Sequence, residues 1–185
     1  MNVSFRQQRG VTLLEVLISI VIMSIGLLGL AGLFSLAGKA EVESYQRIQA
    51  LTYLNDMADR MASNGPVADC YVSSAYGSGT LPSCGAGSNA QSTRAKSDMA
   101  EWVGLLQGST EKSGTTNAGG LIGARGCVEK IATTLTYTDY RISVAWQGMG
   151  DVSDPDSTLV CGKNAYGSEG RRRVVSTLFR LPALG

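Results

Sequence analysis

The stretch that decides the fold is VTLLEVLISIVIMSIGLLGLAGLFSLAG, residues 11–38 of the 185-residue chain. It is almost wholly apolar, contains no proline, and carries one charged residue, Glu15. As an α-helix rising about 1.5 Å per residue, it would extend roughly 42 Å, which exceeds the roughly 30 Å hydrocarbon core of a bilayer. The pattern therefore predicts a transmembrane helix over residues 11–38.

The charges that flank this run predict its orientation. Arg6 and Arg9 precede it without any acidic residue, whereas Lys39 behind it is offset by Glu41 and Glu43. Basic residues stay on the cytoplasmic side of a membrane helix. We therefore expect a single-pass protein of the inner membrane, with a cytoplasmic N-terminus. Residues 39–185 would then form a head in the periplasm of a Gram-negative cell.

A cleaved secretory signal peptide is the competing interpretation of the same run. Ser35-Leu36-Ala37 offers small residues at the spacing that a signal peptidase requires. The apolar stretch before it, however, is longer than the usual core of about 7–15 residues, and Glu15 lies near its start. Both features favour the membrane helix.

Glu15 is out of place in a simple membrane anchor. A carboxylate at bilayer depth costs about 3 kcal/mol on insertion scales unless it is neutralised or paired. One interpretation is that Glu15 lies near the membrane surface and reaches water. The other is that Glu15 forms an ion pair with a cation. Cleavage after Gly10 would give Val11 an α-amino group one helical turn from Glu15, and the pair could form within one chain or between neighbouring copies.

The segment Arg9-Gly10-Val11-Thr12-Leu13-Leu14-Glu15, followed by a long apolar helix, resembles the leader and helix of type IV pilins and their relatives. The resemblance implies that residues 1–10 are a leader, removed by a prepilin peptidase that cuts after Gly10 and N-methylates Val11. It also implies that Glu15 is the carboxylate that guides assembly of the helices into a filament core. One departure is Val11, where the family usually has phenylalanine.

Three glycines, Gly26, Gly29 and Gly32, recur at intervals of three residues inside the apolar run. Each weakens a helix by about 0.5–1 kcal/mol relative to alanine. They either let helices pack closely or soften the helix so that it can partly unwind. The resemblance to pilins favours softening.

The helix is expected to continue as an amphipathic half over residues 39–63 and to stop at Asn64-Gly65-Pro66. Its expected apolar stripe recurs at spacings of three and four residues: Ala40, Tyr45, Ile48, Leu51, Leu54, Met57 or Ala58, and Met61.

Residues 64–126 have a loop-rich composition with one further helix at about 90–107. Ser88 and Gln91 have the spacing of a capping box, and a stripe follows: Ala95, Met99, Trp102 and Leu106. Residues 108–126 are expected to be an exposed loop.

Residues 127–185 predict an antiparallel sheet. Apolar residues alternate along 140–147 and 173–181, as in half-buried strands, and Cys127–Ile131 and Thr158–Cys161 are shorter candidate strands. The expected fold is α+β, a type IV pilin-like long helix packed against a small antiparallel sheet.

Four cysteines allow three disulfide connectivities. Cys70–Cys84 and Cys127–Cys161 are favoured because both close local loops, although free buried thiols are an alternative. Disulfides require an oxidising compartment, which agrees with a periplasmic head.

The composition argues against an enzyme. The chain has no histidine, and no nucleophile, phosphate-binding or dinucleotide motif is present. Asp151, Asp154 and Asp156 are interpreted as a solvated turn, because the glutamate that closes an EF-hand loop is absent. We expect no catalytic residue, metal or cofactor.

The one concentrated charge run is Arg171-Arg172-Arg173. It is interpreted as an exposed strand start that discourages edge pairing, or else as a contact for a partner or for DNA. A net charge of +1 makes binding of nucleic acid unfavoured overall.

Both ends of the chain resemble a minor pilin of type IV pili, through residues 9–31 and the tail segments YRISVAWQG and RRVVSTLFRLP. This implies a subunit that primes pilus assembly and supports twitching motility and adhesion. The implied partners are other minor pilins, the major pilin, prepilin peptidase, the inner-membrane assembly platform and a tip adhesin. A pseudopilin of a type II secretion system and a pilus-associated DNA receptor using Arg171–Arg173 are the alternatives.

Overall fold

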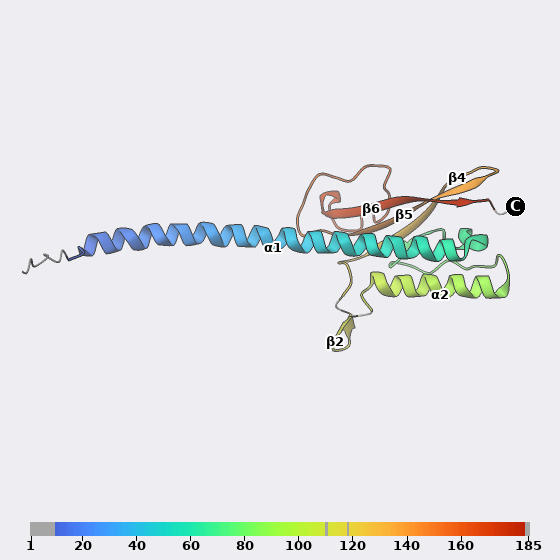
Figure 1. Ribbon diagram of the computed structural model, residues 1–185, viewed down its shortest axis with the longest axis horizontal. Coiled ribbons are helices and arrows are strands. Elements are labelled where there is room, and N and C mark those ends of the chain that lie inside the picture. Colours follow the sequence, from blue (N-terminus) through green and yellow to red (C-terminus); the bar gives the residue numbers. More distant parts are fainter. Residues whose placement is uncertain (1–9, 110, 118, 184–185) are drawn as a thin grey trace, which may run out of the picture. The chain divides into compact units, whose positions relative to one another are not determined.

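The computed structural model describes residues 10–109, 111–117 and 119–183 (Figure 1). The chain forms two compact units, one up to Val42 and the other from Glu43 onward, and each is described by itself. The expected leader, including Arg6 and Arg9, lies outside the described residues except for Gly10.

Helix α1 (Leu13–Ser63) begins in the first unit, and its residues up to Val42 are exposed. Among the described residues it is the helix long and apolar enough to cross a bilayer, by length and composition. Two of its serine hydroxyls are satisfied within the helix, since Ser19 and Ser24 donate to the carbonyls of Glu15 and Ile20 at 2.7 Å. Gly26, Gly29 and Gly32 lie within the helix, and their softening role stays a prediction.

The second unit contains the last part of α1, which ends at Ser63 as Asn64-Gly65-Pro66 predicted. The expected stripe is partly wrong. Leu54, Met57 and Met61 are buried, but Ala40, Tyr45, Ile48 and Leu51 are exposed. The buried face instead begins with Gln46, Ala50 and Tyr53. The apolar pattern misled because Gln46 is buried as a hydrogen-bond acceptor, receiving the indole N–H of Trp146 at 3.2 Å.

A four-stranded antiparallel sheet, in the order β1-β4-β5-β6, forms the second layer. Its strands are β1 (Ser73–Tyr76), β4 (Arg125–Thr133), β5 (Tyr137–Gln147) and β6 (Arg172–Pro182). Short 3-10 helices η1 (Gly65–Tyr71) and η2 (Glu169–Arg171) precede β1 and β6. The strands β2 (Lys112–Ser113) and β3 (Thr116–Asn117) form a separate hairpin.

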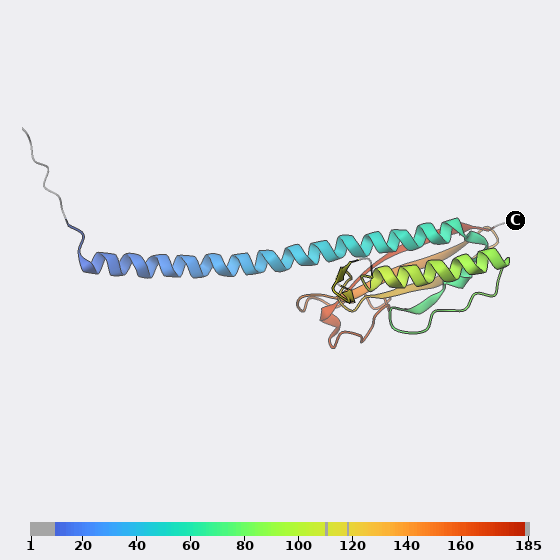
Figure 2. The ribbon, with the colours of Figure 1, turned by 90° about the horizontal axis from the view of Figure 1, so that it is seen from below.

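Helix α2 (Asn89–Leu106) begins with the predicted capping box: Ser88 and Gln91 each accept the other's backbone N–H. Figures 1 and 2 show α2 alongside the last part of α1. The predicted stripe of α2 is buried in one core with α1, η1 and the sheet. Trp102 donates to the Tyr53 carbonyl at 2.8 Å and meets Tyr76 edge-on. Gly126 makes room for that indole, because a Cβ there would lie 2.3 Å from the ring.

The outer face of β5 is also covered, which contradicts the prediction of a half-buried strand. Ser143 and Ala145 are buried like Ile142 and Val144. A smaller cluster of Cys127, Ala145, Cys161 and Tyr166, with Val174 against it, packs on this face. Cys161 and Tyr166 belong to the segment 148–171. This segment has no periodic pattern from which its packing on the sheet could have been predicted.

Three further expectations are corrected. Thr158–Cys161 is not a strand but a turn-rich segment, in which Asp156 accepts hydrogen bonds from the Thr158 backbone and hydroxyl. The expected exposed loop 108–126 contains the β2–β3 hairpin, buries Leu121 and Ala124, and begins β4 at Arg125. Residues 73–76, within the region expected to be loop-rich, form β1, which pairs with β4. The α+β layout itself, a long helix on a small antiparallel sheet, is confirmed.

Candidate assembly site

Thr12 starts α1 and fixes the position of Glu15. The Thr12 hydroxyl and carbonyl both accept the Glu15 backbone N–H, at 3.3 and 3.1 Å, as a helix N-cap does. Glu15 therefore lies in the first turn, where a carboxylate is favoured by the helix dipole. The spacing Thr12-x-x-Glu15 is that of a capping box, a signal that the sequence analysis overlooked.

Gly10, Val11 and Glu15 are exposed, and a Cβ at Gly10 would meet nothing within 4 Å. The Gly10–Val11 bond therefore precedes the first helical turn and is accessible in this structure. A cut there would leave the new amine at Val11, directly before the Thr12 cap. Such an amine and the Glu15 carboxylate would flank the same helix terminus.

Residues 5–31 match a family model described as the prokaryotic N-terminal methylation motif. No curated protein and no solved structure matches the chain. The motif indicates a type IV pilin or pseudopilin. Together with the apolar helix, it is consistent with anchoring in a membrane.

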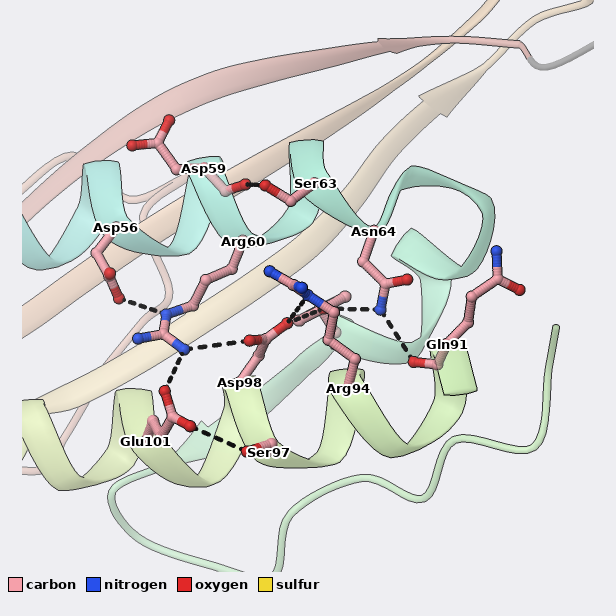
Figure 3. A network of polar contacts seen from close by, with 11 residues as sticks. Asp56, Asp59, Arg60, Ser63, Asn64, Gln91, Arg94, Ser97, Asp98 and Glu101 are labelled. Carbon is pink, nitrogen blue, oxygen red and sulfur yellow. Dashed lines mark hydrogen bonds and ion pairs between the residues drawn. The ribbon is translucent and has the colours of Figure 1, made fainter. Parts of the chain in front are cut away.

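The second unit, which begins at Glu43 and is called the head from here on, contains a second group of polar side chains. They lie between α1 and α2 (Figure 3). Arg60 of α1 donates to Asp56 at 2.7 Å and reaches across to Asp98 at 3.2 Å and Glu101 at 2.8 Å on α2. Asp98 is the buried member and also accepts the Tyr71 hydroxyl at 2.6 Å. Tyr71 accepts in turn from the Asn64 amide at 3.1 Å. The network joins α1, η1 and α2.

These contacts change the proton affinities of the network. Burial, and then the hydrogen bond to Asp98, raises the pKa of Tyr71 above its usual value, so that this hydroxyl stays a donor. The hydrogen bond from Arg60, and then that from Ser97, lowers the pKa of Glu101. A similar effect operates on η1, where the hydrogen bond from Lys130 lowers the pKa of Asp69.

An open groove of about 670 Å³ lies over this network. Apart from Asp59, its charged groups pair with one another across α1 and α2, and Tyr71 adds η1, so the arrangement is a structural clasp between three elements. This network was not predicted from the sequence, although Asp98 beside Met99 on the predicted buried face of α2 was a usable signal. Among the described residues, no group of three or more histidine, cysteine or acidic side chains could hold a metal ion.

The three arginines do not form one exposed patch, which corrects their interpretation as a common contact surface. Arg171 is exposed. Arg172 is 3% exposed; it pairs with Glu169 at 2.6 Å and donates to the carbonyls of Leu159 and Cys161. Arg173 pairs with Glu43 at 2.9 Å. Two of the three side chains therefore organise the head, and they do not guard the start of β6.

Both disulfides join the pairs favoured from the sequence, Cys70–Cys84 and Cys127–Cys161. The first ties η1 to the segment before α2. The second ties the covering segment 148–171 to β4. Because neither segment has regular secondary structure over most of its length, the bonds constrain regions that backbone ladders do not.

Proposed function

We propose that this chain is a minor pilin that takes part in priming type IV pilus assembly, and so supports twitching motility and adhesion. The observation that carries the proposal is the segment from Gly10 to Glu15, which leads into an uninterrupted apolar helix and is matched by the methylation motif. The α+β head with two disulfides agrees with it.

Within minor pilins, the proposal is a subunit similar to PilV. It rests on the resemblance of both ends of the chain, including the tail segments at 140–148 and 172–182. The first segment forms most of β5 and the second forms β6, so together they make up the strand pair at one side of the sheet.

The proposed mechanism is structural rather than catalytic, without a cofactor. After cleavage behind Gly10, the methylated Val11 amine and Glu15 would guide docking of the helix among those of other minor pilins and the major pilin. The head would lie in the periplasm, and then in the pilus. Prepilin peptidase, the inner-membrane assembly platform and a tip adhesin complete the proposed partners.

Intact mass of the membrane-extracted protein tests this proposal. We expect loss of residues 1–10, one added methyl group on Val11, and the loss of four hydrogens for two disulfides. Gly10→Ala should leave the leader attached, because the peptidase then meets a side chain at its cleavage residue. Parent protein that retains its leader, or that is cut near Ala37, contradicts the proposal.

A minor pseudopilin of a type II secretion system remains the second candidate, because the methylation motif indicates either class. Deletion of the gene distinguishes the two. Loss of surface pili with normal secretion supports the pilin, and loss of secretion with normal pili supports the pseudopilin. The DNA-receptor alternative is not favoured, because Arg172 and Arg173 are engaged within the head.

A further inference from the structure

Strand β6 forms one edge of the sheet and pairs with β5 alone among the described strands. The register is continuous, from Tyr137 opposite Pro182 to Gln147 opposite Arg172, without a bulge. A long regular edge of this kind presents a row of backbone donors and acceptors to its surroundings.

Two hydrogen bonds at the ends of the ladder identify which groups point outward. Gly148 donates to the Arg171 carbonyl, and Ala183 donates to the Thr136 carbonyl, both at 2.8 Å. Both pairs continue the same register, so the odd-numbered residues of β6 bond to β5. Residues alternate in an antiparallel ladder. The N–H and C=O groups of the even-numbered residues therefore face the free edge: Val174, Ser176, Leu178 and Arg180.

The middle of this edge lacks the usual devices that prevent pairing with another chain. Residues 174–179 read VVSTLF, without a charge, a proline or a bulge. Leu178 is 67% exposed. Arg172 and Arg173, which could have guarded the start of the strand, are turned into the head. Within the described part of the chain, no hydrogen bond reaches the outward backbone groups of the four even residues.

The last part of α1 lies beside β6 but leaves Ser176, Leu178 and Arg180 exposed. It runs in the same direction as β6, since Glu43 pairs with Arg173 and Gly65 lies beside Leu181. A groove of about 330 Å³ opens beside Trp146, Val174 and Val175 at one end of β6. A second groove of about 300 Å³ opens beside Pro66 and Leu181 at the other end. Both leave room for side chains of an added strand.

We propose that β6 receives an extended segment of a different subunit of the same filament as a fifth strand of the sheet. This inference rests on the proposed function. Main-chain hydrogen bonds from Val174 to Arg180 would provide the attachment. The fitting segment carries β-branched or apolar residues where it borders Leu178. Beside Val174 it meets a groove that Glu43, Arg47 and Arg173 also line.

A second copy of this chain fits the edge less well. Antiparallel pairing of two β6 strands in one continuous sheet places a two-fold axis perpendicular to the sheet. That axis reverses the direction of α1 residues 43–63, so that the two Glu43 ends would leave the pair on opposite sides. Such a pair does not suit two subunits of one filament, whose chains are proposed to enter the heads from the same side.

The test compares Ser176→Pro with Ser176→Thr in the full chain. The Ser176 N–H faces the free edge, so proline removes an outward donor and blocks the edge while leaving the bonds to β5 in place. Threonine keeps the donor. We expect both variants to be processed and folded alike, but the proline variant to be recovered in purified filaments about tenfold less, which corresponds to about 1.4 kcal/mol.

Amide hydrogen exchange of the unsubstituted protein provides the second measurement. We expect the amides of Val174, Ser176 and Leu178 to exchange at least tenfold more slowly in filaments than in the detergent-extracted subunit. Equal recovery of the two variants, or equal exchange in both states, overturns the strand addition and leaves the proposed function standing. Absence of the cleaved parent protein from filaments overturns both. A dimer of the extracted threonine variant that proline abolishes overturns the choice of partner.

Discussion

Glu15 has one physical role that the structure shows and a second that belongs to the proposed function. Thr12 caps the helix by accepting the Glu15 backbone N–H, so Glu15 occupies the first turn at the positive end of the helix dipole. The same position places its carboxylate one turn from a Val11 amine created by cleavage. The first role stabilises the start of the helix; the second would set the register between neighbouring subunits, because a misaligned charge in lipid stays unpaired.

Two substitutions separate the charge of the Glu15 side chain from its size and hydrogen-bonding capacity. Glu15→Gln keeps the size and the hydrogen-bonding capacity of the side chain but removes its charge, whereas Glu15→Ala removes both. We expect both variants to be cleaved and membrane-bound, and both to fall about tenfold or more in filaments because the ion pair is lost. Immunoblots of membrane and sheared-filament fractions measure this. Normal assembly of the glutamine variant would show that assembly does not need the charge of Glu15.

Among the elements, those with a strong local signal were predictable. Helix α2 could be predicted because its capping box and its apolar stripe are both local features. The end of α1 at Ser63 could also be predicted, because Asn64-Gly65-Pro66 cannot continue a helix. Both disulfides followed from spacing. At the N-terminus, the candidate site was found through its motif, although the cap by Thr12 was not.

Elements that depend on distant partners were not predictable. Ser73–Tyr76 becomes a strand because β4 offers it an edge, and its own sequence lacks alternation. Ser143 and Ala145 are buried because a disulfide holds the segment 148–171 over them. Gln46 is buried because Trp146, a hundred residues away, donates to it. In each case a tertiary contact outweighs the local pattern.

The clasp between α1, η1 and α2 gives a prediction at the scale of elements. Asp98→Ala should lower the free energy of unfolding by about 3 kcal/mol, because Arg60 and the Tyr71 hydroxyl lose a shared buried partner. Glu101→Ala is the matched control, since it also removes a carboxylate bonded to Arg60 but from an exposed position. Denaturant unfolding of the detergent-solubilised protein measures both. Similar losses for the two variants would contradict the idea that burial of Asp98 decides the stability of the clasp.

At the scale of the whole molecule, the two units differ in what stabilises them. The buried hydrophobic side chains lie between Ala50 and Val175, as do both disulfides. The described residues up to Val42 are exposed, and those from 11 to 38 are almost wholly apolar, which suits lipid or other helices rather than water. The head therefore carries its own core, and its stability should not depend on the apolar helix.

Residues 39–185 alone, exported to the periplasm, should therefore fold as a soluble domain with both disulfides. Lys39 is chosen as the first residue because one turn then precedes Glu43, whose ion pair with Arg173 lies at the boundary of the unit. Trp102→Ala should destabilise this fragment and the full chain alike, by about 3–5 kcal/mol, because the same buried indole is lost from one core. Circular dichroism melting and thiol counting measure the outcome. A fragment that aggregates or contains free thiols would show that the head needs the preceding helix to fold, and unequal effects of the substitution would show that its core differs in the two proteins.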